Sequence, residues 1–332
     1  MGGGVLRILV LLLLSLSIGI VHAEPKKPAQ QRKTVPKAVT GAKAPHKAVQ
    51  PVASKSGKPA AQARISRRAV APPPPEVFNP DVLNVQSTAA FVVNISNGNV
   101  IFDKNTSAIA PIASITKVMT AMVVLDAQLP MHEPITLTEE DLDQVKYTGS
   151  RLQVGTTLTR DEMLRLTLMS SENRAASALG RSYPGGLSAF VREMNLKALA
   201  LEMRHSSFVD STGLSSGNVS TAQDLVKMVT AAYQYPLIRQ YSTGNGLAVH
   251  GYNGRTLEFG NSNSLIVRPD WQINLSKTGY IREAGRCLVM HTTIADSPFV
   301  IVLLDSWGRL SRVGDANRIK KWIEYHAGRT LG

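Results

Sequence analysis

The chain has 332 residues, of which 43% are hydrophobic and 18% are charged, and its formal net charge is +13. This composition excludes a wholly disordered or fibrous protein and is typical of a chain with at least one globular domain. Because Cys287 is the only cysteine, no disulfide can form within the chain, and the fold must depend on its hydrophobic core.

Residues 1–23 have the pattern of a secretory signal peptide. Arg7 is followed by an apolar run over residues 8–21, which ends at a candidate cleavage site, Val21-His22-Ala23. A run of 14 residues is shorter than the roughly 20 that a membrane-spanning helix needs. We therefore expect a cleaved signal rather than a retained anchor, and no transmembrane segment in the exported protein.

Residues 24–80 differ in composition from the rest of the chain. They hold 12 Lys and Arg against 2 Asp and Glu, and so contribute +10 of the net charge. Because they are rich in proline, alanine and charged residues and poor in aromatic side chains, we expect a disordered linker. In an exported protein such a basic segment can be a solvated spacer or can bind an anionic envelope polymer, and we expect no nucleic acid partner.

Residues 81–332 are long enough for one large folded domain. Residues 89–96 are rich in β-branched side chains, Asn97-Gly98 is a strong hairpin signal, and residues 100–102 continue as a second strand. Strands at both ends of the domain predict an antiparallel sheet of about five strands. Three further strand patterns and a closing amphipathic helix occupy residues 272–277, 286–294, 299–304 and 314–326.

The middle of the domain has mostly helical patterns. Thr159 with Glu162, and Ser220 with Gln223, match the capping box that begins a helix. The sequence therefore predicts an α/β (α+β) fold, in which helices flank the sheet and a mainly helical subdomain is joined to it. We expect a binding site in a cleft between the sheet and this subdomain.

Ser114-Ile115-Thr116-Lys117 stands at the start of a segment with apolar residues at helical spacing. Side chains three residues apart share one helix face, so the Lys117 amine can reach the Ser114 hydroxyl. Burial lowers the pKa of a lysine amine and makes it a candidate base for the serine proton. The alternative is a lysine that reaches solvent from the helix end, and this motif alone does not decide between the two.

Two further motifs follow in order, Ser171-Glu172-Asn173 between helical patterns and Lys277-Thr278-Gly279 at the end of a predicted strand. Together with Ser-x-x-Lys they make up a known set for serine acyl transfer. Lys55-Ser56-Gly57 competes with the third motif, but it lies in the expected linker ahead of the serine. Ser216-Gly217-Asn218 competes with the second motif from a predicted loop and remains the weaker alternative.

The three motifs resemble those of the low-molecular-mass penicillin-binding proteins, serine peptidases that act on D-alanyl peptides. Within that family the chain is most similar to the D-alanyl-D-alanine endopeptidase branch. The resemblance implies a β-lactamase/transpeptidase-like fold, peptidoglycan peptides as substrates in the periplasm, and covalent inhibition by β-lactam antibiotics. We expect no cofactor and no metal. The resemblance covers about residues 85–327 and rests on residues 113–121, 168–176, 212–225 and 277–290.

The first two motifs can be assigned roles in catalysis. Ser114 attacks the D-alanyl carbonyl while Lys117 accepts its proton. We expect burial and the positive field of Lys277 to keep Lys117 neutral. Ser171 can relay the proton to the leaving amine, and the Asn173 amide can contact both Lys117 and the substrate.

The third motif and its neighbours are candidates for substrate binding. Lys277 and Thr278 offer a positive charge and a hydroxyl to a substrate carboxylate. The resemblance implies that Gly279 belongs to the substrate-binding strand, and that the N–H groups of the nucleophile and of Tyr280 form the oxyanion hole. Arg312, after the last strand pattern, can hold a substrate carboxylate, with a surface role as the alternative.

Three other functions compete with the endopeptidase. A class A β-lactamase needs a further carboxylate to activate the water that deacylates the enzyme. Glu193 is the nearest candidate, but its segment ends in Lys197, where the β-lactamase pattern Glu-x-x-Leu-Asn has asparagine. A non-catalytic cell-wall binding protein would use the cleft and the linker for adhesion only. A D-alanyl-D-alanine carboxypeptidase is the third. Only 53 residues follow Gly279, too few for the extra domain that the resemblance implies for carboxypeptidases, so we expect an endopeptidase.

Overall fold

The computed structural model describes residues 79–308 and 310–330. The expected signal peptide, residues 1–23, and residues 24–78 of the expected linker lie outside this range. The predicted binding of an anionic polymer by the linker therefore also concerns residues that the structure does not describe. Among the described residues, no helix combines the length and the hydrophobicity that crossing a membrane requires.

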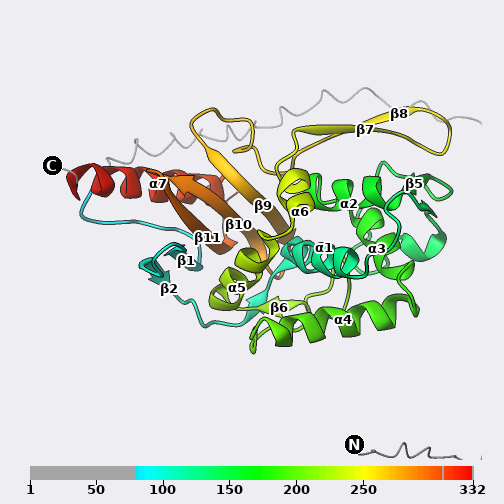
Figure 1. Ribbon diagram of the computed structural model, residues 1–332, viewed down its shortest axis with the longest axis horizontal. Coiled ribbons are helices and arrows are strands. Elements are labelled where there is room, and N and C mark those ends of the chain that lie inside the picture. Colours follow the sequence, from blue (N-terminus) through cyan, green and yellow to red (C-terminus); the bar gives the residue numbers. More distant parts are fainter. Residues whose placement is uncertain (1–78, 309, 331–332) are drawn as a thin grey trace, which may run out of the picture. The chain divides into compact units, whose positions relative to one another are not determined.

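A five-stranded antiparallel sheet confirms the predicted sheet (Figure 1). Its strand order, β2-β1-β11-β10-β9, pairs the first hairpin of the domain with the last strand of the chain. As a result β9, which carries the third motif, lies at one edge of the sheet. The strands are β1 Ala89–Asn94, β2 Val100–Lys104, β9 Gln272–Ile281, β10 Gly285–Ile294 and β11 Ser297–Ser306.

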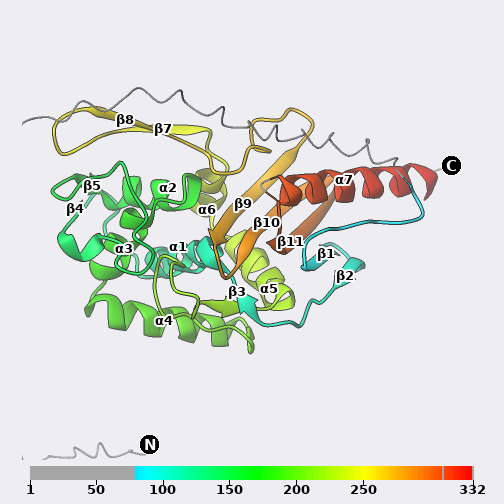
Figure 2. The same ribbon diagram turned by 180° about the vertical axis from the view of Figure 1, so that it is seen from behind.

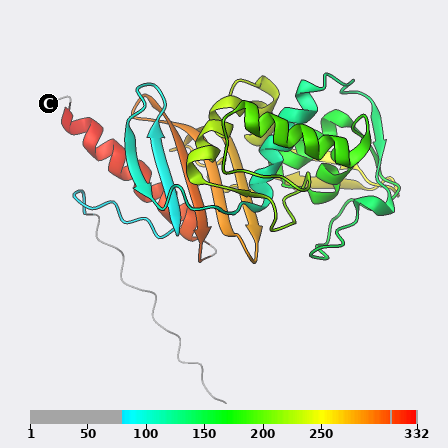
Figure 3. The same cartoon turned by 90° about the horizontal axis from the view of Figure 1, so that it is seen from below.

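Helices cover both faces of this sheet (Figure 3). Side chains alternate between faces along a strand, so Val289 of β10 packs into one core while its neighbour Leu288 packs into another. Helix α5, Ala222–Ala232, lines the first core, and helix α7, Ser311–Thr330, lines the second. Burial on both faces explains why the last strand pattern, residues 299–304, is continuously apolar.

A mainly helical subdomain adjoins the sheet, as predicted (Figure 2). Among the described residues it also contains three small antiparallel strand pairs, none of which the sequence predicted. Its helices are η1 Ala113–Ile115, α1 Thr116–Asp126, η2 Glu139–Asp141, α2 Arg160–Met169, α3 Asn173–Arg181, α4 Gly186–Ala200 and α6 Pro236–Ser242. The paired strands are β3 Ala110–Pro111 with β6 Val219–Ser220, β4 Pro134–Thr136 with β5 Thr157–Thr159, and β7 Gly246–His250 with β8 Thr256–Gly260.

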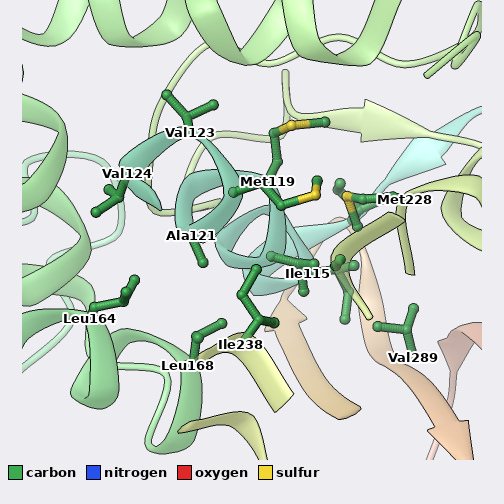
Figure 4. Packing of buried hydrophobic residues seen from close by; sticks show 14 of the residues in the cluster. Ile115, Met119, Ala121, Val123, Val124, Leu164, Leu168, Met228, Ile238 and Val289 are labelled. Carbon is green, nitrogen blue, oxygen red and sulfur yellow. The ribbon is translucent and has the colours of Figure 1, made fainter. Parts of the chain in front are cut away.

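Helix α1 lies in the centre of the subdomain and is buried on all sides. Figure 4 shows Met119 and Val124 of α1 among side chains from α2, α5, α6 and β10. Met119 is fully buried, and Val124 is nearly so. This confirms the predicted buried helix, and it holds the turn just before α1, which carries Ser114, in a fixed position.

Two local predictions are wrong. The third motif lies inside β9 rather than at its end, because the strand continues through the polar residues to Ile281. The second capping box is also wrong: Thr221, not Ser220, caps α5, and its side chain accepts from the backbone N–H of Asp224. Ser220 belongs to β6 instead. The first capping box, Thr159 with Glu162, is confirmed.

Candidate active site

Ser114 lies in the short 3-10 turn η1, directly before α1. Its neighbours Ala113 and Ile115 are fully buried, whereas Ser114 is partly exposed. Ala113 has a φ of +48°, a left-handed backbone conformation that non-glycine residues adopt only where the surrounding structure imposes it. The strained turn therefore holds Ser114 in a fixed position and leaves it partly open to solvent.

Lys117 is fully buried, which excludes the alternative of a lysine that reaches solvent. Its Nζ donates to Ser114 Oγ at 2.9 Å, to Asn173 Oδ1 at 2.8 Å and to the carbonyl oxygen of Thr212 at 2.5 Å. Burial lowers the pKa of Lys117 to about 8, although nearby carboxylates, Asp210 first among them, act in the opposite direction. An amine with such a pKa can give up its proton near neutral pH.

The second motif occupies the turn between α2 and α3. Ser171 is partly exposed and has a φ of +62°, again a left-handed conformation of a non-glycine residue. Asn173 is the first residue of α3, and its amide bridges two groups. Its Oδ1 accepts from Lys117, and its Nδ2 donates to Thr148 Oγ1 at 3.1 Å. These two bonds fix which amide atom faces the lysine.

Asn218, from the competing Ser-x-Asn segment, has a structural role. It is fully buried. Its Nδ2 donates to Thr116 Oγ1 and to the carbonyl oxygen of Asp210, while its Oδ1 accepts from the N–H of Val209. Because these bonds hold the loop together and none of them reaches Lys117, the geometry favours residues 171–173 as the second motif.

The loop that Asn218 organises supplies a contact that sequence reasoning missed. Asp210 Oδ1 accepts from the N–H groups of Thr212 and Gly213, which forms a tight turn. The turn aims the Thr212 carbonyl at Lys117. Gly213 has a φ of +80°, and a Cβ there would lie 2.0 Å from the carbonyl oxygen of Ala113. A backbone carbonyl has no side-chain signature, so the only sequence signal was the Thr-Gly pair in a stretch already linked to the family.

Lys277 is 1% exposed, and its Nζ donates to the carbonyl oxygen of Thr278 at 2.9 Å. Burial lowers the pKa of Lys277 well below its usual value, and the positive charges of Lys117 and Arg312 lower it further. This corrects the expectation that the field of Lys277 keeps Lys117 neutral. In the free protein the repulsion between the two amines lowers the pKa of Lys277, and burial alone is what lowers the pKa of Lys117.

Gly279 allows β9 to lie directly against η1, the turn that carries Ser114. A Cβ at this position would lie 2.9 Å from the carbonyl oxygen of Ile112 and 3.2 Å from the backbone nitrogen of Ser114. Only glycine allows two backbones to approach this closely without displacement. Tyr280, the next residue, is exposed, and the Arg286 guanidinium lies 4.5 Å above its ring centre. The predicted proximity of this strand to the serine is thus present.

Arg312 lies in the first turn of α7 and is partly buried. Its Nη1 donates to the carbonyl oxygens of Gly279 and Cys287, both at 3.1 Å. The arginine therefore supports the strand that carries the third motif, and a purely surface role is wrong. Its contact with a substrate carboxylate stays a prediction.

An ion pair joins a loop of the subdomain to a turn of the sheet. Lys146, in the loop that also carries Thr148, lies 2.5 Å from Glu283 in the turn between β9 and β10. Beside Asn173, a cavity of about 220 Å³ opens between this loop and the Thr212 loop. The candidate site thus lies where β9 of the sheet meets the turn before α1, with a serine, a buried lysine and an asparagine in direct contact. The predicted cleft between sheet and subdomain stays a prediction, because the cavity beside Asn173 is lined by subdomain residues.

Comparison with known proteins agrees with this arrangement. Residues 76–307 match the sequence profile of peptidase family S11, the D-alanyl-D-alanine carboxypeptidases, and the chain belongs to this family. It is 46% identical to a D-alanyl-D-alanine endopeptidase of Pseudomonas aeruginosa, over 76% of this chain and 82% of the relative. It is 44% identical to a D-alanyl-D-alanine endopeptidase of Escherichia coli, over 72% of this chain and 78% of the relative. The predicted family is confirmed, and with it a serine peptidase.

Solved structures confirm the fold class. The Streptomyces K15 DD-transpeptidase superposes with a TM-score of 0.67 at 24% identity, over 72% of this chain and 97% of that one. Penicillin-binding protein D2 from Listeria monocytogenes, in its ampicillin-bound form, superposes with a TM-score of 0.62 at 26% identity, over 73% of this chain and 98% of that one.

Proposed function

We propose that this serine peptidase is a periplasmic endopeptidase that cleaves D-alanyl cross-links between peptidoglycan peptides through an acyl-enzyme on Ser114. The observation that carries the proposal is the contact of the partly exposed Ser114 hydroxyl with the buried amine of Lys117. A serine is a weak nucleophile at neutral pH and needs an adjacent base, and a lysine with a lowered pKa can serve as that base.

The reaction has two steps. Neutral Lys117 takes the Ser114 proton while the serine oxygen forms a bond to the D-alanyl carbonyl carbon. The amide C–N bond then breaks, and the leaving amine receives a proton through Ser171. Water hydrolyses the resulting ester and restores the serine. The N–H groups of Ser114 and Tyr280 stabilise the negative carbonyl oxygen in both steps, a contribution of about 2.7–4 kcal/mol per donor in serine hydrolases.

The third motif can bind a carboxylate on the leaving side of the substrate. Such a carboxylate places a counter-charge beside the buried amine of Lys277, and so raises the pKa of Lys277. The Thr278 hydroxyl on the same strand offers a hydrogen bond to the same group.

Endopeptidase activity is favoured over carboxypeptidase activity by the relatives. Those with the highest identity among the proteins described above are named D-alanyl-D-alanine endopeptidases, whereas a relative from Bacillus subtilis that is named a carboxypeptidase is 28% identical. Carboxypeptidase activity is the second candidate, because the family as a whole carries that name. By analogy with the ampicillin-bound relative, β-lactams acylate the same serine.

Product analysis by mass tests the choice. Purified cross-linked muropeptide dimers should fall to monomers, while monomeric pentapeptides lose D-alanine slowly or not at all. Ser114→Ala should abolish both dimer cleavage and labelling by fluorescent penicillin. Ser216→Ala, which changes an exposed serine in the Thr212 loop, is the control and should keep both. Rapid release of D-alanine from pentapeptides would favour the carboxypeptidase, and rapid turnover of penicillin would indicate a β-lactamase.

A further inference from the structure

The segment Asn261-Ser262-Asn263 connects β8 to β9 and lies beside the third motif. Its two asparagines are structural. Asn261 Nδ2 donates to the carbonyl oxygen of Ser242 at 3.0 Å, and Asn263 Nδ2 donates to Ser276 Oγ at 2.8 Å. Asn263 is 3% exposed, whereas Ser262 is partly open to solvent. The flanking amides thus fix the backbone that presents the Ser262 side chain.

Ser262 contacts β9, which carries the third motif, and the last residue of α2, which directly precedes the turn with the second motif. Its N–H donates to the carbonyl oxygen of Met169 at 2.9 Å, at the end of α2 and two residues before Ser171. Its Oγ accepts from Thr278 Oγ1 at 2.8 Å. The position of Ser262 is therefore determined jointly by the end of α2 and by β9.

The hydroxyl proton of Ser262 is free for a ligand. A hydroxyl has one proton to donate and two lone pairs to accept with. Thr278 uses its proton on Ser262, and in the part of the chain that the structure describes Ser262 Oγ makes no second hydrogen bond. The Thr278 bond polarises the Ser262 hydroxyl and makes it a better donor. A preorganised donor next to the substrate-binding strand points to an anionic or carbonyl acceptor.

We propose that Ser262 donates its hydroxyl proton to the carboxylate on the leaving side of the substrate, in series with Thr278. This inference rests on the proposed function, which places that carboxylate at the third motif. The buried Lys277 and the partly buried Arg312 supply the positive field that an anion needs there. Ser262 is thus a specificity-determining residue for substrates and β-lactams that carry this carboxylate.

Benzylpenicillin and its methyl ester test the proposal, because they share one β-lactam ring and differ in whether the carboxylate is charged. The second-order rate of acylation of Ser114 is measured for each compound on the full chain. A hydrogen bond to a charged group contributes enough to predict that Ser262→Ala slows acylation by benzylpenicillin roughly 10-fold or more. The rate for the methyl ester should change little.

Three further variants serve as controls. Ser262→Thr keeps the hydroxyl and should retain most of the rate with benzylpenicillin. Ser264→Ala changes an exposed serine two residues away and should leave both rates unchanged. In the double variant Ser262→Ala with Thr278→Ala, the acylation rate with benzylpenicillin should fall by less than the product of the two single-variant factors, because the two hydroxyls act in series.

Equal slowing for the acid and the ester would assign Ser262 a structural role and overturn the proposal, and so would an unchanged rate with the acid. If Ser262→Ala fails to fold, a loss of carboxylate selectivity in the folded Ser262→Cys variant supports the proposal, and retained selectivity overturns it. Failure of the proposed function is recognised separately: the wild-type protein would then not be acylated at Ser114 by either compound.

Discussion

The Nζ atom of Lys117 lies 2.9 Å from the hydroxyl oxygen of Ser114, in a site where the lysine is wholly excluded from solvent. The two residues are three positions apart, so the contact follows from the helical turn itself. The burial does not follow from the turn, because it depends on the packing of α1 against helices α2, α3, α4, α5 and α6. For Lys117 to act as a base toward Ser114, it needs both this contact and the burial that lowers its pKa.

Replacing Lys117 by arginine should be as damaging as replacing it by alanine. Arginine keeps the positive charge but does not lose its proton in a protein, so it cannot act as a base. General bases contribute about 10²- to 10⁴-fold to such reactions, and we expect a loss of acylation in that range, measured with labelled penicillin. Lys197→Arg, in which arginine keeps the charge that pairs with Asp126, should retain activity. Substantial activity in Lys117→Arg would show that the residue acts only through its charge.

Acylation should depend on pH through the amine of Lys117. Because the pKa of Lys117 is about 8 in the folded protein, the protonated form predominates below that pH and cannot accept the serine proton. The second-order rate of acylation should therefore rise as the pH increases through about 8 and then level off. Stopped-flow labelling of the free enzyme measures this profile. A rate that falls over the same interval would mean that the protonated amine is the active form.

Asn173 and Asn218 should respond differently to substitution. Asn173→Ala removes the acceptor of the Lys117 bond, so acylation should fall by about 10-fold or more while the melting temperature changes little. Asn218→Ala leaves buried partners in the loop without bonds, and should cost about 1–3 kcal/mol of unfolding free energy. Calorimetry and penicillin labelling of both variants separate the two effects. A reversed ranking would move the second motif to residues 216–218.

Gly279→Ala should impair acylation by displacing β9 from η1, the turn that carries Ser114. The added methyl group would meet backbone atoms of Ile112 and Ser114, which cannot move aside as a flexible side chain can. We expect a loss of about 10-fold or more, since a misplacement of about 1 Å can cost about 10²-fold. Gly149→Ala is the matched control, because a Cβ there would meet no atom within 4 Å. Equal activity of the two variants would show that the close approach is unimportant.

Much of the architecture was predictable because it depends on local periodicity. The last strand has an unbroken apolar run over residues 299–304, as expected of a strand in a sheet that is covered on both faces. The limits of β9 were not predictable, because a polar motif within the strand interrupts that pattern. The β7–β8 hairpin was missed, since its strands expose several side chains and lack a strong apolar run.

The sequence by itself determined which side chains are candidates for the chemistry and in what order they occur: a serine three residues before a lysine, then Ser171 and Asn173, then Lys277. These are side-chain identities at fixed spacing, and a helix turn or a strand converts such spacing directly into proximity. The order of the three motifs along the chain was therefore sufficient to recognise the family.

Only the tertiary structure decided which partners these groups contact and how far their pKa values are shifted. The Thr212 carbonyl that holds Lys117 comes from 95 positions along the chain, and the Ser262 hydroxyl reaches Thr278 from a separate loop. The charge states of Lys117 and Lys277 depend on how completely each is buried and on which charges lie near it. Burial and the contacts of backbone atoms are properties of the packed chain, because distant segments create them and no single segment carries their signature.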